Sequence, residues 1–334
     1  MEGGMKMAYK MLRTASCGFR FKLSTRNSHH ITLIGQYALR MFQSVPRNIQ
    51  FALLSVLLFA PAFVSAQDFT ARALGDYGNV TVMEIQGNYD ARLADGTENL
   101  VPRQEIAKEF FKTHKDEYDF LVIFTNFGYH MPETEALSFF KGIKNDSLGI
   151  GLPLYDGSEE YGSSRLQGTI DMGNIANHAT APLDPRFEGT LRVLSHELMH
   201  RWASYIKFKD ASGNFSTALL GKDGFHWSFL LDTAGSLMYG NTWQDNGNGT
   251  FTSLSPMAEM KYYSPLDLYL MGMIDKSKVP PMLLITSPTT DSTQLPQTGV
   301  TVNGTARYVT MDQISASSST IGDKREHGTY GHME

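Results

Sequence analysis

Apolar runs and alternating apolar positions predict several strands and a helix in the first half of the chain. Residues 80–86 (VTVMEIQ) predict a strand, and the unbroken run FLVIF at 120–124 is typical of a buried central strand. Two glycine-punctuated segments, 149–152 and 168–175, are weaker strand candidates. Residues 102–114 form an amphipathic pattern with proline at the start, which predicts a helix.

A second helix is predicted to begin near Asp184 and Pro185, which would provide a cap and a first-turn proline. Its apolar side chains recur at steps of four, three and four residues and share one face: Phe187, Leu191, Leu194 and Leu198. We expect that face to pack against the core, since a surface helix buries its apolar stripe.

The second half is rich in Gly, Ser, Asn and Thr, and we expect it to be irregular, with two short helices. Ser264, Pro265 and Asp267 predict the start of one of them, as a cap, a first-turn proline and a third-position acid. Residues 311–334 are polar and are expected to be partly disordered. The expected fold is therefore mixed α/β (α+β), with a twisted mixed sheet and helices up to about residue 207 and a loop-rich half after it, together covering 67–310.

The segment before residue 67 has the pattern of a targeting signal. An apolar run of 15 residues, 49–63, is shorter than the ~20 residues of a spanning helix and is followed by Val64, Ser65 and Ala66. We expect export by a signal peptide cleaved after Ala66, without stable membrane insertion afterwards; an uncleaved anchor is the alternative. The leader is long, and Met41 is a candidate for the true start, with residues 1–40 as an extension.

Charge and cysteine content exclude several classes of function. Residues 67–334 contain 21 basic and 33 acidic side chains, a net charge of −12, which argues against a nucleic-acid partner. The one cysteine, Cys17, excludes disulfide frameworks and thiolate metal sites. Any metal must therefore be held by His, Asp or Glu.

The second predicted helix carries the sequence His196-Glu197-Leu198-Met199-His200. Positions four apart differ by about 40° around a helix, so both imidazoles can hold one ion. Glu197 lies beside them, where its carboxylate reaches a metal-bound water rather than the metal. Zinc lowers the pKa of such a water to roughly 7, and Glu197 then acts as the general base.

A catalytic zinc site requires a third protein ligand and leaves the fourth position for water. His226 is the best candidate, because it lies in the loop-rich half beside Trp227. The rival acids are Asp232, Glu259 and Asp267, of which Asp267 is the second choice because it already has an explanation as a helix-start acid.

The His196 to His200 motif resembles that of the zincin metallopeptidases, and residues 236–239 resemble the methionine-containing turn of metzincins. The long separation along the chain between His200 and His226 resembles that in leishmanolysin-like members, where an insertion separates the second and third histidines. The resemblance covers roughly residues 80–275. It implies a zincin fold and protein or peptide substrates, bound by main-chain hydrogen bonds to an edge strand such as 168–175. A transition-state role for Tyr239 is not implied, because the family's tyrosine stands two residues after the methionine.

We therefore expect a secreted zinc-dependent endopeptidase with Glu197 as its base. One alternative is a zinc amidase acting on cell-wall or other non-protein amides, and another is a surface adhesion module with structural zinc.

Residues 245–250 have the oxygen-rich composition of a calcium loop, but two Asn-Gly pairs favour a hairpin.

Overall fold

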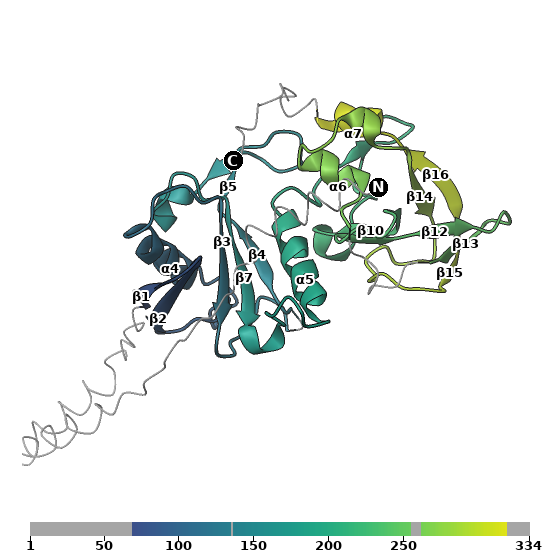
Figure 1. The fold of residues 1–334 in the computed structure, drawn as a ribbon. Helices are drawn as coiled ribbons and strands as arrows, with labels where there is room; N and C mark the ends of the chain where they lie inside the picture. The colour runs from purple at the N-terminus through teal and green to yellow at the C-terminus, as the bar shows by residue number, and fades with distance from the viewer. Residues whose placement is uncertain (1–68, 135, 255–261, 319–334) are drawn as a thin grey trace, which may run out of the picture.

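The computed structural model describes residues 69–134, 136–254 and 262–318. Over these ranges the chain is a mixed α/β protein with four helices and several small sheets (Figure 1). The helices are α4 (Val101–Phe111), α5 (Phe187–Met199), α6 (Pro265–Leu270) and α7 (Met311–Ser318). The predicted signal peptide, with Met41 and Ala66, lies outside the described residues, as does Glu259.

Short strands separated by loops are spread over the rest of the described chain. Those of the first half are β1 (Thr70–Tyr77), β2 (Val80–Gln86), β3 (Phe120–Thr125), β4 (Phe139–Gly142), β5 (Lys144–Asn145), β6 (Tyr155–Asp156) and β7 (Gly168–Asn174). Those of the second half are β8 (Phe208–Lys209), β9 (Phe215–Ser216), β10 (Trp227–Asp232), β11 (Tyr239–Asn241), β12 (Trp243–Asp245), β13 (Thr250–Ser253), β14 (Met282–Thr286), β15 (Thr301–Asn303) and β16 (Thr305–Val309).

The sheet nearest to α5 has the order β3-β7-β4, with β3 parallel and β4 antiparallel to β7. It is a mixed sheet, as expected, and the strands predicted at 80–86, 120–124 and 168–175 are confirmed as β2, β3 and β7. The expectation that residues 168–175 form an edge strand is wrong. β7 is central and paired on both sides, so its main-chain groups are already used within the sheet, and β3 and β4 are the two edge strands.

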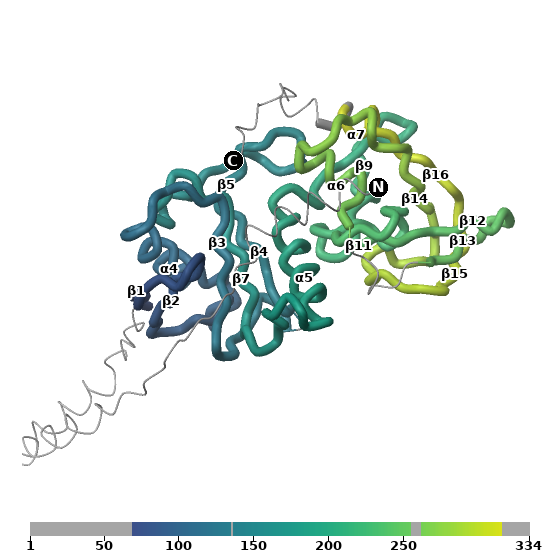
Figure 2. The backbone as a smooth tube through the Cα atoms, in the orientation of Figure 1, coloured from purple at the N-terminus to yellow at the C-terminus, as the bar shows by residue number. Residues whose placement is uncertain are grey.

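Helix α5 lies between the two halves of the molecule (Figures 1 and 2). Its side chains Val193, Leu194 and Leu198 pack with Ile170 and Met172 of β7. On another side of the helix, Met199 belongs to the large core cluster of the second half. The predicted apolar face, of which Leu194 and Leu198 pack on β7, is therefore only part of the surface that the helix buries, because the helix is covered from two sides. The helix begins at Phe187, with Arg186 at the cap position and no side-chain cap. The predicted cap at Asp184 and first-turn proline at Pro185 are therefore wrong: both residues precede the helix, and Asp184 accepts a hydrogen bond from the Arg186 amide.

The second half is more regular than expected. Its strands form a four-stranded sheet, β11-β10-β14-β16, and a three-stranded sheet, β12-β13-β15. This half is loop-rich, as expected, but the two sheets were not predicted, because short strands paired across long distances carry little local signal. The predicted helix start at Ser264 is confirmed: Ser264 and Asp267 form a capping box at the beginning of α6.

Two further predictions differ from the structure. Residues 149–152 form turns instead of a strand, and Gly151 has φ +90°, where a Cβ would lie 2.3 Å from the Tyr205 carbonyl oxygen. The tail from residue 311, expected to be partly disordered, begins with helix α7. Met311 and Ile314 of that helix are buried in the large core cluster, which explains why it folds. Residues 319–334 lie outside the described residues.

Candidate metal centre

His196 and His200 lie at the carboxyl end of α5. His196 is in its last turn and His200 is the residue that caps it. Their ring centroids are 4.9 Å apart, with the ring planes at 89° to each other. The spacing of four residues thus places both imidazoles on one side of the helix end, where they can approach one ion.

His226 joins them from the second half of the chain, immediately before β10. Its Nε2 atom lies 3.2 Å from Nε2 of His196, and its ring centroid is 5.0 Å from that of His200. Each of the three histidines offers a nitrogen, and these atoms all lie within 4.8 Å of one another. Across the described ranges, these three form the one group of His, Cys, Asp or Glu side chains close enough to share an ion.

Carbonyl groups orient two of the rings. His196 Nδ1 lies 2.7 Å from the Leu237 carbonyl oxygen, and His226 Nδ1 lies 3.2 Å from that of Lys222. A carbonyl only accepts hydrogen bonds, so each Nδ1 carries the proton and donates it. In the neutral ring Nε2 then keeps its lone pair, which is the tautomer that a metal ligand needs.

Burial favours the neutral form of the His200 and His226 imidazoles. It lowers the pKa of His226 to about 3 and holds the pKa of His200 well below its usual value, with the neighbouring His196 adding to both effects. Neutral imidazoles bind metal ions, whereas imidazolium does not. The three histidines could therefore hold a metal ion at neutral pH.

Glu197 points toward the edge strand β4. Its Oε1 accepts a hydrogen bond of 2.7 Å from the Ser138 hydroxyl, and the Phe140 amide also donates to its carboxylate. Only 7% of Glu197 is exposed. Burial raises the pKa of this carboxyl, while the charge of His196 and these two donors act in the opposite direction.

The rival acids lie in other environments. The Asp267 carboxylate accepts hydrogen bonds from Trp227 Nε1 at 2.8 Å, Ser236 Oγ at 2.6 Å and the Ser264 amide at 2.7 Å. It is not part of the histidine group. Asp232 accepts hydrogen bonds from the amides of Ala234 and Trp243. Both carboxylates thus have structural partners in place of a shared ion.

Asp267 nevertheless supports the cluster indirectly. Its partner Trp227 follows His226, and its partner Ser236 precedes Leu237, whose carbonyl orients His196.

Replacing Asp267 with Asn leaves fewer acceptors for these buried donors. We expect a loss of about 2 kcal/mol in unfolding free energy and a zinc affinity reduced roughly 10-fold. Urea denaturation and metal competition would measure both, with the exposed Asp245→Asn as control; an unchanged affinity would show that Asp267 does not support the ligands.

The segment 236–239 packs against the histidines. Met238 is fully buried, and the ring of Tyr239 stacks on His226 with centroids 4.4 Å apart and planes at 14°. Tyr239 has φ +75°, an uncommon conformation for a non-glycine residue. The stacking of Tyr239 and the contact of Ser138 with Glu197 were not anticipated from the sequence, because no local spacing connects those residues.

The candidate calcium loop is a hairpin. It joins β12 to β13, and within it Asp245 accepts from the Gly247 amide while Asn248 accepts from the Thr250 amide. Two further histidines of the described residues lie outside the cluster: His114 stacks on Phe110, and His178 hydrogen-bonds to the Met172 carbonyl.

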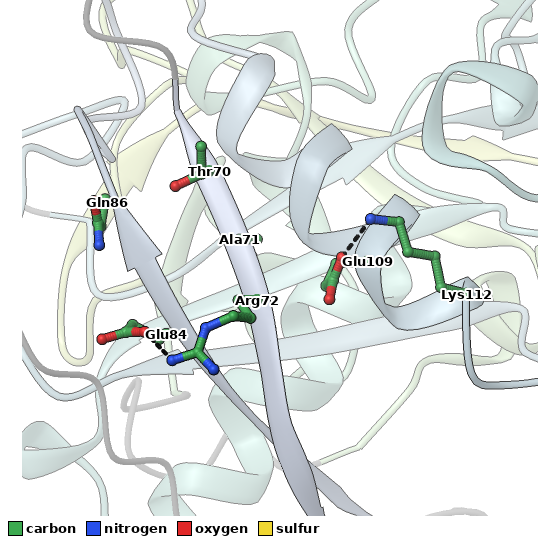
Figure 3. Close-up of a pocket in the computed structure, with 7 residues that line it drawn as sticks. All are labelled: Thr70, Ala71, Arg72, Glu84, Gln86, Glu109 and Lys112. Atoms are coloured by element: carbon green, nitrogen blue, oxygen red, sulfur yellow. Dashed lines mark hydrogen bonds and ion pairs between the residues drawn. The ribbon is translucent and has the colours of Figure 1, made fainter.

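A surface pocket is formed by β1, β2 and α4 and does not include the histidines (Figure 3). Its charged side chains pair with one another, Arg72 with Glu84 and Lys112 with Glu109. These pairs leave no excess charge to recognise a ligand, so the pocket is not a second candidate site.

Comparisons with family models, with curated proteins and with solved structures found no match to this chain. Among the helices of the described residues, none is long and apolar enough to cross a membrane. The candidate site therefore stands on its own geometry: three histidine nitrogens that face one position, with a buried carboxylate on the neighbouring residue.

Proposed function

We propose that the protein is a secreted zinc-dependent endopeptidase of zincin-like architecture. The observation that carries the proposal is the convergence of nitrogens from His196, His200 and His226 within 4.8 Å, from two parts of the chain. Three histidines and an open position are typical of catalytic zinc. The export part of the proposal rests on the signal-peptide pattern that ends at Ala66.

His196, His200 and His226 would hold the ion. Bound zinc would supply Lewis acidity, polarising a carbonyl and lowering the pKa of a water molecule. Glu197 would accept a proton from the attacking water, keep it on its carboxylate, and deliver it to the nitrogen of the leaving amine. Its burial supports this role, because a carboxylate with a raised pKa exchanges protons near neutral pH more readily than an exposed one.

The edge strand β4 is the candidate for substrate alignment, in place of β7. It is unpaired on one side within the β3-β7-β4 sheet, and Glu197 contacts it through Ser138 and Phe140. An extended peptide beside β4 would lie next to the general base. This arrangement and the zincin resemblance both support protein or peptide substrates.

Two alternatives make different predictions. A zinc amidase would use the same residues on a non-protein amide, such as one in cell-wall material. An adhesion module would need the histidines only as structural ligands, and the burial of Glu197 beside them argues against it, since a buried carboxylate is costly to maintain without a role.

Chelation tests the proposal. The purified protein should cleave casein or a peptide library, lose that activity with a zinc chelator, and regain it when zinc is added back. Cleavage of cell-wall fragments but not of peptides would favour the amidase instead. Peptide cleavage that is insensitive to the chelator would refute the metal-dependent mechanism.

A further inference from the structure

We propose that Ser138 is a positioning residue for the general base: its hydroxyl, together with the Phe140 amide, holds the Glu197 carboxylate against the edge strand β4. The catalytic consequence rests on the proposed peptidase function. The contact itself is a property of the fold and is tested separately below. Ser138 lies 59 positions before Glu197 and outside the histidine cluster, so the motif on α5 gives no sign of it.

The two donors come from alternate residues at the start of β4. Ser138 immediately precedes Phe139, the first residue of the strand, and its Oγ lies 2.7 Å from Glu197 Oε1. The main-chain N–H of Phe140 donates to the same carboxylate. The Ser138 hydroxyl is therefore the side-chain donor whose geometry sets where the carboxylate oxygen lies, and Phe140 adds to the stabilisation of the charge.

Both partners of the Ser138 hydrogen bond are buried. Ser138 and Glu197 are each 7% exposed, so water contributes little to solvating the carboxylate. In such surroundings, donors to a charged oxygen are worth more than they are in water. Removing the hydroxyl would leave the Phe140 amide as the remaining hydrogen-bond donor, and the carboxylate would gain freedom to turn away from its working position.

A buried ion pair packs against the strand that follows Ser138. Phe139 pairs in register with Asp171 of β7, and the guanidinium of Arg103 lies 5.1 Å from the centre of the Phe139 ring. Arg103 and Asp171 form an ion pair of 2.8 Å, with both side chains almost fully buried. Tyr89 also donates to Asp171, at 2.7 Å. This network makes β4 a rigid support, which is what precise positioning of a catalytic group requires.

The same hydrogen bond could serve only to attach α5 to the sheet. That role predicts a loss of stability but no selective effect on the chemical step. The two roles separate if turnover, substrate binding, zinc content and stability are all measured on the same variants.

The first experiment compares Ser138→Ala, Ser138→Thr and the control Ser163→Ala in the full chain. Ser163 is also a buried serine whose hydroxyl donates to a carboxylate, that of Asp116, and it is not in the site. For Ser138→Ala we expect kcat to fall about 10-fold, with KM and zinc content little changed. Ser138→Thr keeps the hydroxyl and should restore most of the rate, and the control should stay within twofold of the wild type.

A double variant shows whether Ser138 acts through Glu197. In the Glu197→Gln background, Ser138→Ala should cause no further loss of the residual rate, because the group that it positions is already absent. A full 10-fold loss in that background would contradict the proposal. So would a Ser138→Ala variant whose kcat stays within twofold of the wild type.

The second experiment needs no activity. Hydrogen exchange of the Phe140 amide, followed by NMR, should be slow in the wild type and clearly faster in Glu197→Ala, while the Ile170 amide of β7 keeps its protection. If exchange at Phe140 is unaffected, Glu197 is not held on β4. If instead the exchange result holds but the wild type cleaves no peptide, the proposed function fails while the hydrogen-bonded arrangement remains.

Discussion

Glu197→Gln is expected to lower kcat for peptide cleavage by at least about 100-fold while zinc remains bound. The glutamine keeps the shape of the side chain but cannot accept a proton, and general-base catalysis contributes roughly 10²–10⁴-fold to rate. His196, His200 and His226 are unchanged in this variant, so the donor set that would hold the ion is intact. Steady-state kinetics and metal analysis of the same preparation would measure both quantities.

The matched control is Glu188→Gln. Glu188 lies in the first turn of the same helix, is exposed, and is at the opposite end of the helix from His196 and His200. It should retain the wild-type rate. Wild-type kcat in Glu197→Gln would show that another group takes the proton. Loss of zinc from Glu197→Gln would show that the carboxylate acts as a ligand and not as a base.

His226→Ala is expected to have the largest effect on metal binding. It removes one of three nitrogens and leaves His196 and His200, which belong to a single helix end. Structural zinc sites with four ligands bind with about 10–16 kcal/mol, so losing one ligand should weaken binding on the order of 1000-fold. Competition with a chromophoric chelator would measure the affinity, and peptide cleavage should fall with it.

His130→Ala controls for the loss of a histidine as such. The His130 side chain is 92% exposed and lies near Asp90, outside the cluster. Its removal should leave zinc affinity unchanged. Equal affinities for His226→Ala and the wild type would exclude His226 as a ligand, and an acid such as Glu259 would then have to be tested.

Local sequence patterns predicted those parts of the fold that depend on neighbouring residues. The unbroken apolar run of β3 and the Ser264 to Asp267 capping box of α6 are examples, since burial and capping are decided within a few positions. The second half was underestimated because its strands are short. β13, for instance, pairs with β15 about fifty residues later, and such pairing has no local signature.

Strand order was also hidden from the sequence. β7 was expected at an edge, but the four-residue strand β4 pairs with its free side. The phenylalanines of β4 show no alternation that would mark it as a strand. The mistake matters for function, because it moves the proposed substrate edge from β7 to β4 and brings it into contact with Glu197.

For the candidate site, the predictable part was the pair on one helix. The spacing of His196 and His200 alone places their rings on one side, whereas the position of His226 depends on how the two halves pack around α5. The supporting contacts follow from that packing too: the Leu237 carbonyl on His196, and Ser138 on Glu197. None of these is encoded by spacing along the chain.

The most direct test of the account is zinc analysis of the purified protein combined with X-ray absorption at the zinc edge. Three imidazoles from His196, His200 and His226 predict one zinc per chain, with nitrogen ligands at about 2.0–2.1 Å and one further light ligand. A protein that takes up no stoichiometric zinc would contradict the account, as would a bound zinc whose ligands include no imidazole.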